Sequence, residues 1–309
     1  MSTPTNDARE PRADAQEIAP DTLSPARLMY WSIRRELWEN RSVWIAPLVV
    51  ATVALLAFLG TVPALPKSVR ALSGPDIANA HLKVHGPYGA AAMVGFATAF
   101  VVGVFYCLDA LQGERRDRSI LFWKSLPVSD RTTVLAKASV PLGILPLIVF
   151  AVTVAAHTIM LLVSTAVLLA TGASVGALWA NIQPFQSAVT VLYIVIVIAL
   201  WHAPLYGWLL LVSGWARRSA LVWAALPLVA IAGIERILFG TTQFLYFLKY
   251  LLLGWAPQAL AFEDSAMTDL LGLLTPGRFL STPSLWIGLA FTVACLVAAI
   301  RLRHRREPV

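Results

Sequence analysis

The run WIAPLVVATVALLAFLGTV, residues 44–62, has no charged side chain over nineteen consecutive positions. An α-helix needs about 20 predominantly apolar residues to cross the hydrocarbon core of a bilayer. With five further runs of similar character we expect six spans, at about 44–62, 90–112, 138–168, 187–213, 219–239 and 284–301. Prolines inside the third and fourth spans predict local kinks; they are Pro141, Pro146 and Pro204. The fold class is therefore an all-α polytopic membrane protein.

The composition excludes a large soluble domain. The 309 residues are 58% hydrophobic and 13% charged, with a mean hydropathy of +0.71. An ordinary soluble domain has about a quarter of its residues charged, which this chain cannot match. The two cysteines, Cys107 and Cys295, both lie inside apolar runs, so we expect small buried side chains and neither a disulfide nor a metal site.

Basic residues are distributed unevenly between the segments that connect the spans. Of the 24 Lys and Arg residues, six precede the first span, six lie in the 113–137 loop, two follow the fourth span and four follow the sixth. Lys and Arg are enriched in the cytoplasmic loops of membrane proteins, which accounts for the net charge of +7. We therefore expect no nucleic-acid partner. The bias predicts that both termini are cytoplasmic.

The chain divides into four parts. Residues 1–24 are polar and lack an apolar period, which predicts a disordered cytoplasmic tail. In residues 25–42 the side chains of Met29, Ile33 and Leu37 share one face, with Trp31 and Trp38 at its border, which predicts an amphipathic helix in the membrane interface. Residues 43–301 form the six-span domain, and 302–309 are a basic cytoplasmic tail.

The outer connection 240–283 contains a second apolar stretch, FLYFLKYLLLGWAPQAL, which is interrupted by Lys249, Gly254 and Pro257. A full crossing there would put the C-terminal arginines on the outer side, against the charge distribution. We expect a re-entrant or interfacial pair of helices instead.

Catalytic and metal-binding motifs are absent from the sequence. It contains no phosphate-binding Gly-x-x-x-x-Gly-Lys-Ser/Thr loop, no His-Glu-x-x-His, no paired cysteines and no Gly-x-Ser-x-Gly. We therefore expect no catalytic residue, no metal site and no cofactor on this chain, and the protein is not an enzyme by itself.

Five polar side chains within or near the spans are candidates for a translocation path. Charged and polar groups in a membrane are costly and often functional, although hydrogen bonds between helices are the commoner explanation. His157 and His202 lie in mid-span and either line a path, face each other or bond neighbouring helices. Asp109, Glu235 and Arg236 lie near span ends, where ion pairing competes with a role in a path or gate.

The connection between the second and third spans, GERRDRSILFWKSLPVSDR at 113–131, is both charged and apolar. Ile120, Trp123 and Leu126 form one short apolar face, and Pro127 ends that turn. Such an element suits docking into a groove of a soluble partner, and equally a membrane surface rich in anionic lipid.

Three stretches of the sequence resemble the permease subunits of bacterial type-2 ATP-binding-cassette exporters. They are WSIRRELWENRS at 31–42, LDALQGERRDRSILFWKSLPVSDRTTVLAK at 108–137, and VSGWARRSALVWAALP at 212–227. The resemblance implies a protein of the bacterial inner membrane in which 25–42 is the interfacial connecting helix. It also implies two permease chains, identical or related, and a dimer of a soluble P-loop ATPase that binds ATP and Mg.

By the same resemblance, the 113–137 segment is a cytoplasmic coupling loop that rests on the ATPase subunit. The residues expected to contact that subunit are Glu114, Arg115, Arg116, Arg118, Ile120, Trp123, Lys124 and Leu126. The expected function is coupling of ATP hydrolysis to alternating-access export of an amphipathic substrate. A membrane scaffold that binds a cytosolic partner, and an ion-coupled carrier, are the alternatives. The carrier is disfavoured because the sequence has no clear internal repeat and no acidic residue in mid-span.

Overall fold

The computed structural model describes residues 24–116, 129–261 and 271–305. Within these ranges the chain is helical, and its one β-type contact is an isolated bridge between Leu260 and Leu274. The expected disordered tail and the apolar face of the 113–137 loop fall outside the described residues, except for Ser24 at the edge of the tail.

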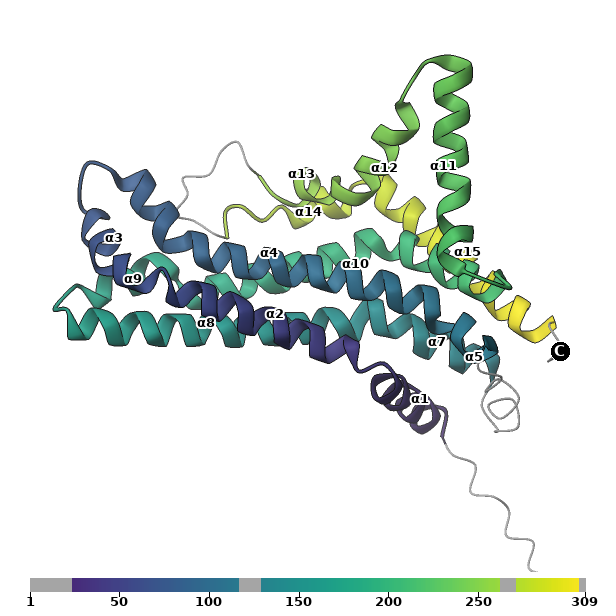
Figure 1. Ribbon diagram of the computed structural model, residues 1–309, viewed down its shortest axis with the longest axis horizontal. Helices are drawn as coiled ribbons and strands as arrows, with labels where there is room; N and C mark the ends of the chain where they lie inside the picture. Colours follow the sequence, from purple (N-terminus) through teal and green to yellow (C-terminus); the bar gives the residue numbers. More distant parts are fainter. Residues whose placement is uncertain (1–23, 117–128, 262–270, 306–309) are drawn as a thin grey trace, which may run out of the picture.

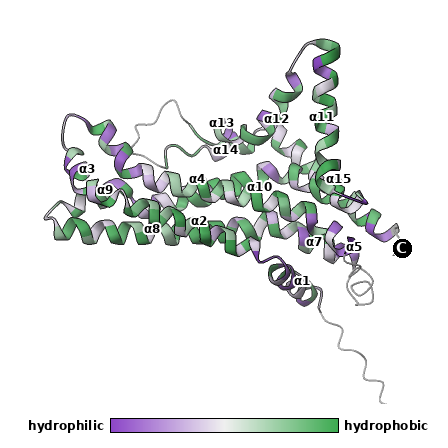
Figure 2. Ribbon diagram, viewed as in Figure 1, coloured by the Kyte–Doolittle hydropathy of each residue, from purple (hydrophilic) through white to green (hydrophobic). Residues whose placement is uncertain are grey.

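Among the described residues, six helical segments are long and apolar enough to cross a membrane, the same number as the spans that the sequence predicts. Figure 2 shows that their residues are largely hydrophobic and that more hydrophilic residues lie at the ends of the bundle. The main helices are α2 (Ser42–Leu59), α4 (Ile77–Ala110), α8 (Leu145–Ala170), α10 (Pro184–Trp215), α11 (Ala220–Phe239) and α15 (Pro283–Arg305).

Shorter helices cap the two ends of this bundle (Figure 1). We call one end the α1 end; it holds α1 (Pro25–Glu39), α5 (Gln112–Arg116), α7 (Asp130–Ser139) and the C-terminal end of α15. We call the other the α3 end; it holds η1 (Val62–Ala64), α3 (Leu65–Ala71) and α9 (Val175–Ile182). The chain therefore enters and leaves the bundle at the same end.

Two helices extend beyond the apolar runs that predicted them. Helix α4 begins at Ile77 rather than near 90, and its additional turns carry His81, Lys83 and His85. Hydropathy marks where a helix can contact lipid, whereas backbone hydrogen bonding lets the same helix continue into polar surroundings. The helix of the third span begins at Asp130, eight residues before the predicted span, because α7 continues into α8. The two are joined by a π-helical turn, Val140–Ile144, that contains Pro141. The missing proline N–H and its ring account for the widened turn at this predicted kink.

Close packing between α10 and α15 depends on two glycines. A Cβ atom at Gly288 would lie 2.7 Å from Cγ of Pro204, and one at Gly207 would lie 3.2 Å from Cα of Thr292. Small residues allow membrane helices to approach each other, because packing replaces the hydrophobic effect between helices that are surrounded by lipid. Pro204 of α10 thus lies against a glycine of α15.

Helix α11 projects away from the bundle (Figure 1) and buries only Ala220 and Ala224. After it, α12 (Gln243–Leu253), α13 (Trp255–Ala259) and α14 (Pro276–Leu280) return to the side of α10. The indole Nε1 of Trp201, in the middle of α10, donates to the carbonyl of Leu251 at 2.9 Å. Carbonyls in the last turn of a helix have no partner within it, so α10 satisfies this end of α12.

Candidate functional site

A cluster of charged side chains lies inside the α1 end of the bundle. We call it the buried ion cluster, and its members are Arg35, Glu36, Glu114, Asp130, Lys137 and Arg303. They come from α1, α5, α7 and α15, four segments that are far apart in the sequence. Glu36 is 1% exposed, Lys137 2% and Glu114 8%, so these charges are shielded from solvent within the fold.

Lys137 is the centre of the cluster. Its Nζ lies 2.9 Å from Oε1 of Glu36 and 3.2 Å from Oε1 of Glu114. The same Glu114 oxygen is 3.1 Å from Nη2 of Arg35, and its other oxygen is 2.6 Å from Nη1 of Arg303. Each carboxylate is therefore shared between cations on different helices, and the charges balance one another.

Two further contacts complete the surroundings of the cluster. The hydroxyl of Tyr106, on α4, donates to Oε2 of Glu36 at 2.8 Å. Nε of Arg303 donates to Oδ1 of Asp130 at 2.9 Å, which joins the end of α15 to the start of α7. These contacts matter because a buried charge is tolerated only when its hydrogen-bonding capacity is largely satisfied.

Helix α1 delivers its acidic residues to the bundle because of how it starts and how its faces are arranged. The side chain of Ser24 accepts from the backbone N–H of Arg27 at 3.4 Å, and Pro25 occupies the first turn, as the sequence predicts. Glu36 then faces inward, while Trp31 and Trp38 are exposed on the other side with the Arg34 guanidinium 5.0 and 5.4 Å from their ring centres.

Glu39 lies at the rim of the cluster, outside the membrane-spanning helices. Burial raises the pKa of its carboxyl group, and Arg35, with Nε 3.5 Å from Glu39 Oε1, opposes that change. Glu39 is 44% exposed, whereas Glu36 is enclosed, so the rim of the cluster lies closer to solvent than its centre.

Arg115 and Gln112 attach the beginning of the 113–137 loop to the α10–α11 connection. The guanidinium of Arg115 donates to the carbonyls of Ser213 and of Ala216, the latter at 2.8 Å. Oγ of Ser213 accepts from the backbone N–H of Gln112 at 3.0 Å, and Oε1 of Gln112 accepts from the N–H of Ala220 at 2.9 Å. Together with the ion cluster, these bonds tie the base of the loop to α1, α10, α11 and α15.

The residues predicted to contact a partner are placed in three different ways. Glu114 and Arg115 point into the bundle, so a contact through these side chains would require the network to open. Arg116 is 67% exposed, with its Nη1 3.7 Å from Oδ1 of Asp109. Arg118, Ile120, Trp123, Lys124 and Leu126 lie outside the described residues. Partner contact at all these positions stays a prediction.

The two mid-span histidines do not face each other. His157 Nε2 lies 3.0 Å from the carbonyl of Tyr88, whereas the His202 ring lies 5.0 Å from that of Phe100. Tyr88 and Phe100 are twelve residues apart on α4, or about 18 Å at 1.5 Å per residue. His202 also lies with Nδ1 2.9 Å from the carbonyl of Ile198 and Nε2 3.1 Å from that of Leu252. Both rings thus form hydrogen bonds with backbone carbonyls. The contact with Tyr88 joins α8 to α4, and the contact with Leu252 joins α10 to α12.

Glu235 and Arg236 organise the turn between α11 and α12. The Glu235 carboxylate accepts the backbone N–H groups of Gln243 at 2.7 Å and Phe244 at 2.8 Å, which lie in the first turn of α12. A carboxylate there satisfies orphan donors and complements the helix dipole. Nη1 of Arg236 donates to the carbonyl of Gly240 at 2.9 Å. These contacts are hydrogen bonds within the turn, and a role of the two residues in a path or gate stays a prediction.

The buried ion cluster is the feature that inspection of the sequence missed. In the sequence, Lys137 and Arg303 count only as positive charges of a loop and a tail, and Arg35 and Glu36 are two polar residues of the predicted amphipathic helix. No pattern within α1 indicates a partner about 100 residues away. The described residues contain no group of three or more His, Cys, Asp or Glu side chains that could hold a metal ion.

Comparison with known proteins identifies no relative: no family model matches the chain, and no curated protein matches it.

Proposed function

We propose that this chain is the transmembrane permease subunit of an ATP-driven exporter. In this proposal a soluble P-loop ATPase, which binds ATP and Mg, docks on the α1 end, and hydrolysis on that subunit drives alternating access in the permease. The proposal rests on the resemblance of three sequence stretches to type-2 exporter permeases, on the six apolar helices, and on the network at the α1 end.

The observation that carries most weight is how the 113–137 loop is held. Its first residues include Glu114, paired with Arg35 and Arg303, and its last is Lys137, paired with Glu36 and Glu114. A force on the loop would therefore act on α1, α4, α7 and α15 together. That is the mechanical property required of an element that converts ATPase movement into rearrangement of helices.

The proposed orientation in the membrane rests on the position of the chain ends and on the distribution of positive charge. The chain enters and leaves at the α1 end, and positively charged residues favour the cytoplasmic side. We place the α1 end in the cytoplasm, α1 in the membrane interface with Trp31 and Trp38 toward lipid, and the protein in the bacterial inner membrane. The α12–α14 segment is then re-entrant from the outer side, since α12 ends beside the middle of α10.

A second permease chain would complete the translocation path. Helix α11 is apolar and almost wholly exposed in the single chain, so it has a large surface for contact with lipid or another chain. Amphipathic molecules are the substrate class that aromatic and aliphatic helix surfaces suit.

The test is co-expression with a candidate P-loop ATPase, followed by purification in mild detergent and measurement of vanadate-sensitive ATP hydrolysis. We expect a stable complex in which Arg116→Glu lowers permease-dependent stimulation of ATPase activity several-fold. Lys67→Glu, an equal charge change at the α3 end, should leave stimulation unchanged. Reversal of Arg115 is unsuitable for this purpose because its guanidinium bonds the Ser213 and Ala216 carbonyls.

Two outcomes would reject the proposal. If no ATPase copurifies and the chain instead retains another cytosolic protein, the scaffold alternative is favoured. If transport into proteoliposomes follows an imposed ion gradient without any ATPase, the chain is an ion-coupled carrier.

A further inference from the structure

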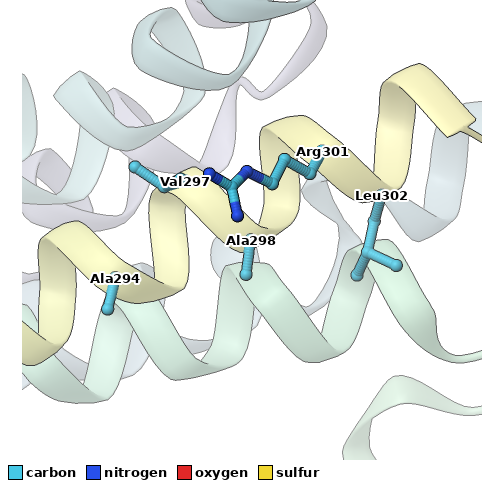
Figure 3. A pocket seen from close by; sticks show the side chains of 5 residues that line it. All are labelled: Ala294, Val297, Ala298, Arg301 and Leu302. Atoms are coloured by element: carbon cyan, nitrogen blue, oxygen red, sulfur yellow. The ribbon is translucent and has the colours of Figure 1, made fainter.

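A shallow groove of about 540 Å³ runs along the outward side of α15 near the α1 end (Figure 3). Its lining is apolar except at one position, and consists of Ala294, Val297, Ala298, Arg301 and Leu302. The small side chains of Ala294 and Ala298 lie along the lining, and Leu302 lies at its C-terminal end. The groove is thus a shallow apolar hollow on one face of α15 with a single positive charge beside it.

Arg301 and the nearby Arg303 differ in the direction of their side chains and in their ion pairs. Arg303 points inward and pairs with Glu114 and Asp130. Arg301 is exposed and forms no ion pair with any described residue, and Figure 3 shows its side chain folded back over Val297. An arginine that lies on apolar surface keeps its stem on that surface and directs its guanidinium toward an anion or water.

The depth of Arg301 in the membrane narrows the choice of anion. Arg301 follows Pro283, the first residue of α15, by eighteen positions, or about 27 Å along the helix. The hydrocarbon core is about 30 Å thick, so Arg301 lies near the boundary between the acyl chains and the headgroups. A phosphate is the anion present in quantity at that depth, and guanidinium groups bind phosphate through two parallel hydrogen bonds.

We infer that the α15 groove is a binding site for an anionic phospholipid. The phosphate pairs with Arg301, and one acyl chain lies along Ala294, Val297 and Ala298. Charge selects the lipid class, since a zwitterionic headgroup carries its own cation next to the phosphate and gains less from the arginine. The inference requires that α15 span a bilayer, and it does not depend on the proposed transport activity.

Lipid binding can be measured on the purified full-length chain by native mass spectrometry. The probes are dioleoylphosphatidylglycerol and dioleoylphosphatidylcholine, which have the same acyl chains. We expect phosphatidylglycerol to be retained preferentially, and Arg301→Gln to weaken its binding about fivefold, the effect of one basic residue at a membrane surface. Arg217→Gln, which removes an exposed arginine from the α10–α11 connection, is the matched control and should bind as the unaltered chain does.

A second pair of variants tests the apolar part of the site. Ala298→Phe fills the groove and should also reduce phosphatidylglycerol binding, whereas Ala290→Phe, an exposed position of α15 outside the groove, should not. Equal binding of both lipids, or unchanged binding in Arg301→Gln, would overturn the proposal. Displacement of phosphatidylglycerol by inorganic phosphate alone would also overturn it. So would loss of a dimer in Ala298→Phe with lipid binding intact, since a second chain would then occupy the groove.

Discussion

Replacement of Lys137 by methionine should be among the most destabilising single changes at the α1 end. Methionine keeps much of the volume of the lysine side chain and removes the cation that lies between Glu36 and Glu114. Removal of one partner from a buried ion pair costs about 3–5 kcal/mol, because the remaining charge stays buried without compensation. Arg35 is 3.1 Å from Glu114 and 2.9 Å from Glu36, so we expect the lower half of that range.

The free energy of unfolding can be measured by titration with sodium dodecyl sulfate in mixed micelles, followed through tryptophan fluorescence. Arg131→Met, on the exposed side of the same helix, is the control and should change stability by at most about 0.5 kcal/mol. In Glu36→Gln/Lys137→Met the loss should be smaller than the sum of the single losses by about 0.5–3 kcal/mol. If Lys137→Met is no less stable than Arg131→Met, the ion cluster does not hold the α1 end together.

Two further predictions concern other parts of the bundle. Gly288→Ala should destabilise the protein by about 1–3 kcal/mol in the same titration, because its Cβ would lie 2.7 Å from Pro204 Cγ. The control is Gly233→Ala, whose Cβ would meet nothing within 4 Å and which should change stability by at most about 1 kcal/mol. Equal losses in the two variants would show that close packing at Gly288 does not contribute to stability. Trp201→Phe removes the donor to the last turn of α12 and should increase hydrogen exchange of the α12 amides several-fold, whereas Trp286→Phe should leave α12 exchange unchanged. Equal protection of α12 in both tryptophan variants would show that this bond does not hold the helix.

The extent to which the sequence predicts the fold differs between elements. The six spans follow from apolar run length, since transfer into lipid depends on composition that a local window contains. The start of α1 follows from Ser24 and Pro25, and both are observed in the expected positions. The early start of α4 at Ile77 does not follow, because its first turns are polar and only the backbone continues the helix.

The candidate site shows a sharper division. Composition, charge bias and motif resemblance by themselves indicated a membrane protein with six spans, and drew attention to the loop at 113–137. Only the tertiary structure decided that Glu114 faces inward and that Lys137 and Arg303 pair with it. The physical reason is that pairing depends on which helix faces meet, which is set by long-range packing, whereas span formation depends on the free energy of each segment in lipid. The sequence of a charged loop therefore predicts on which side of the membrane the loop lies, but it does not predict which residue each charge pairs with.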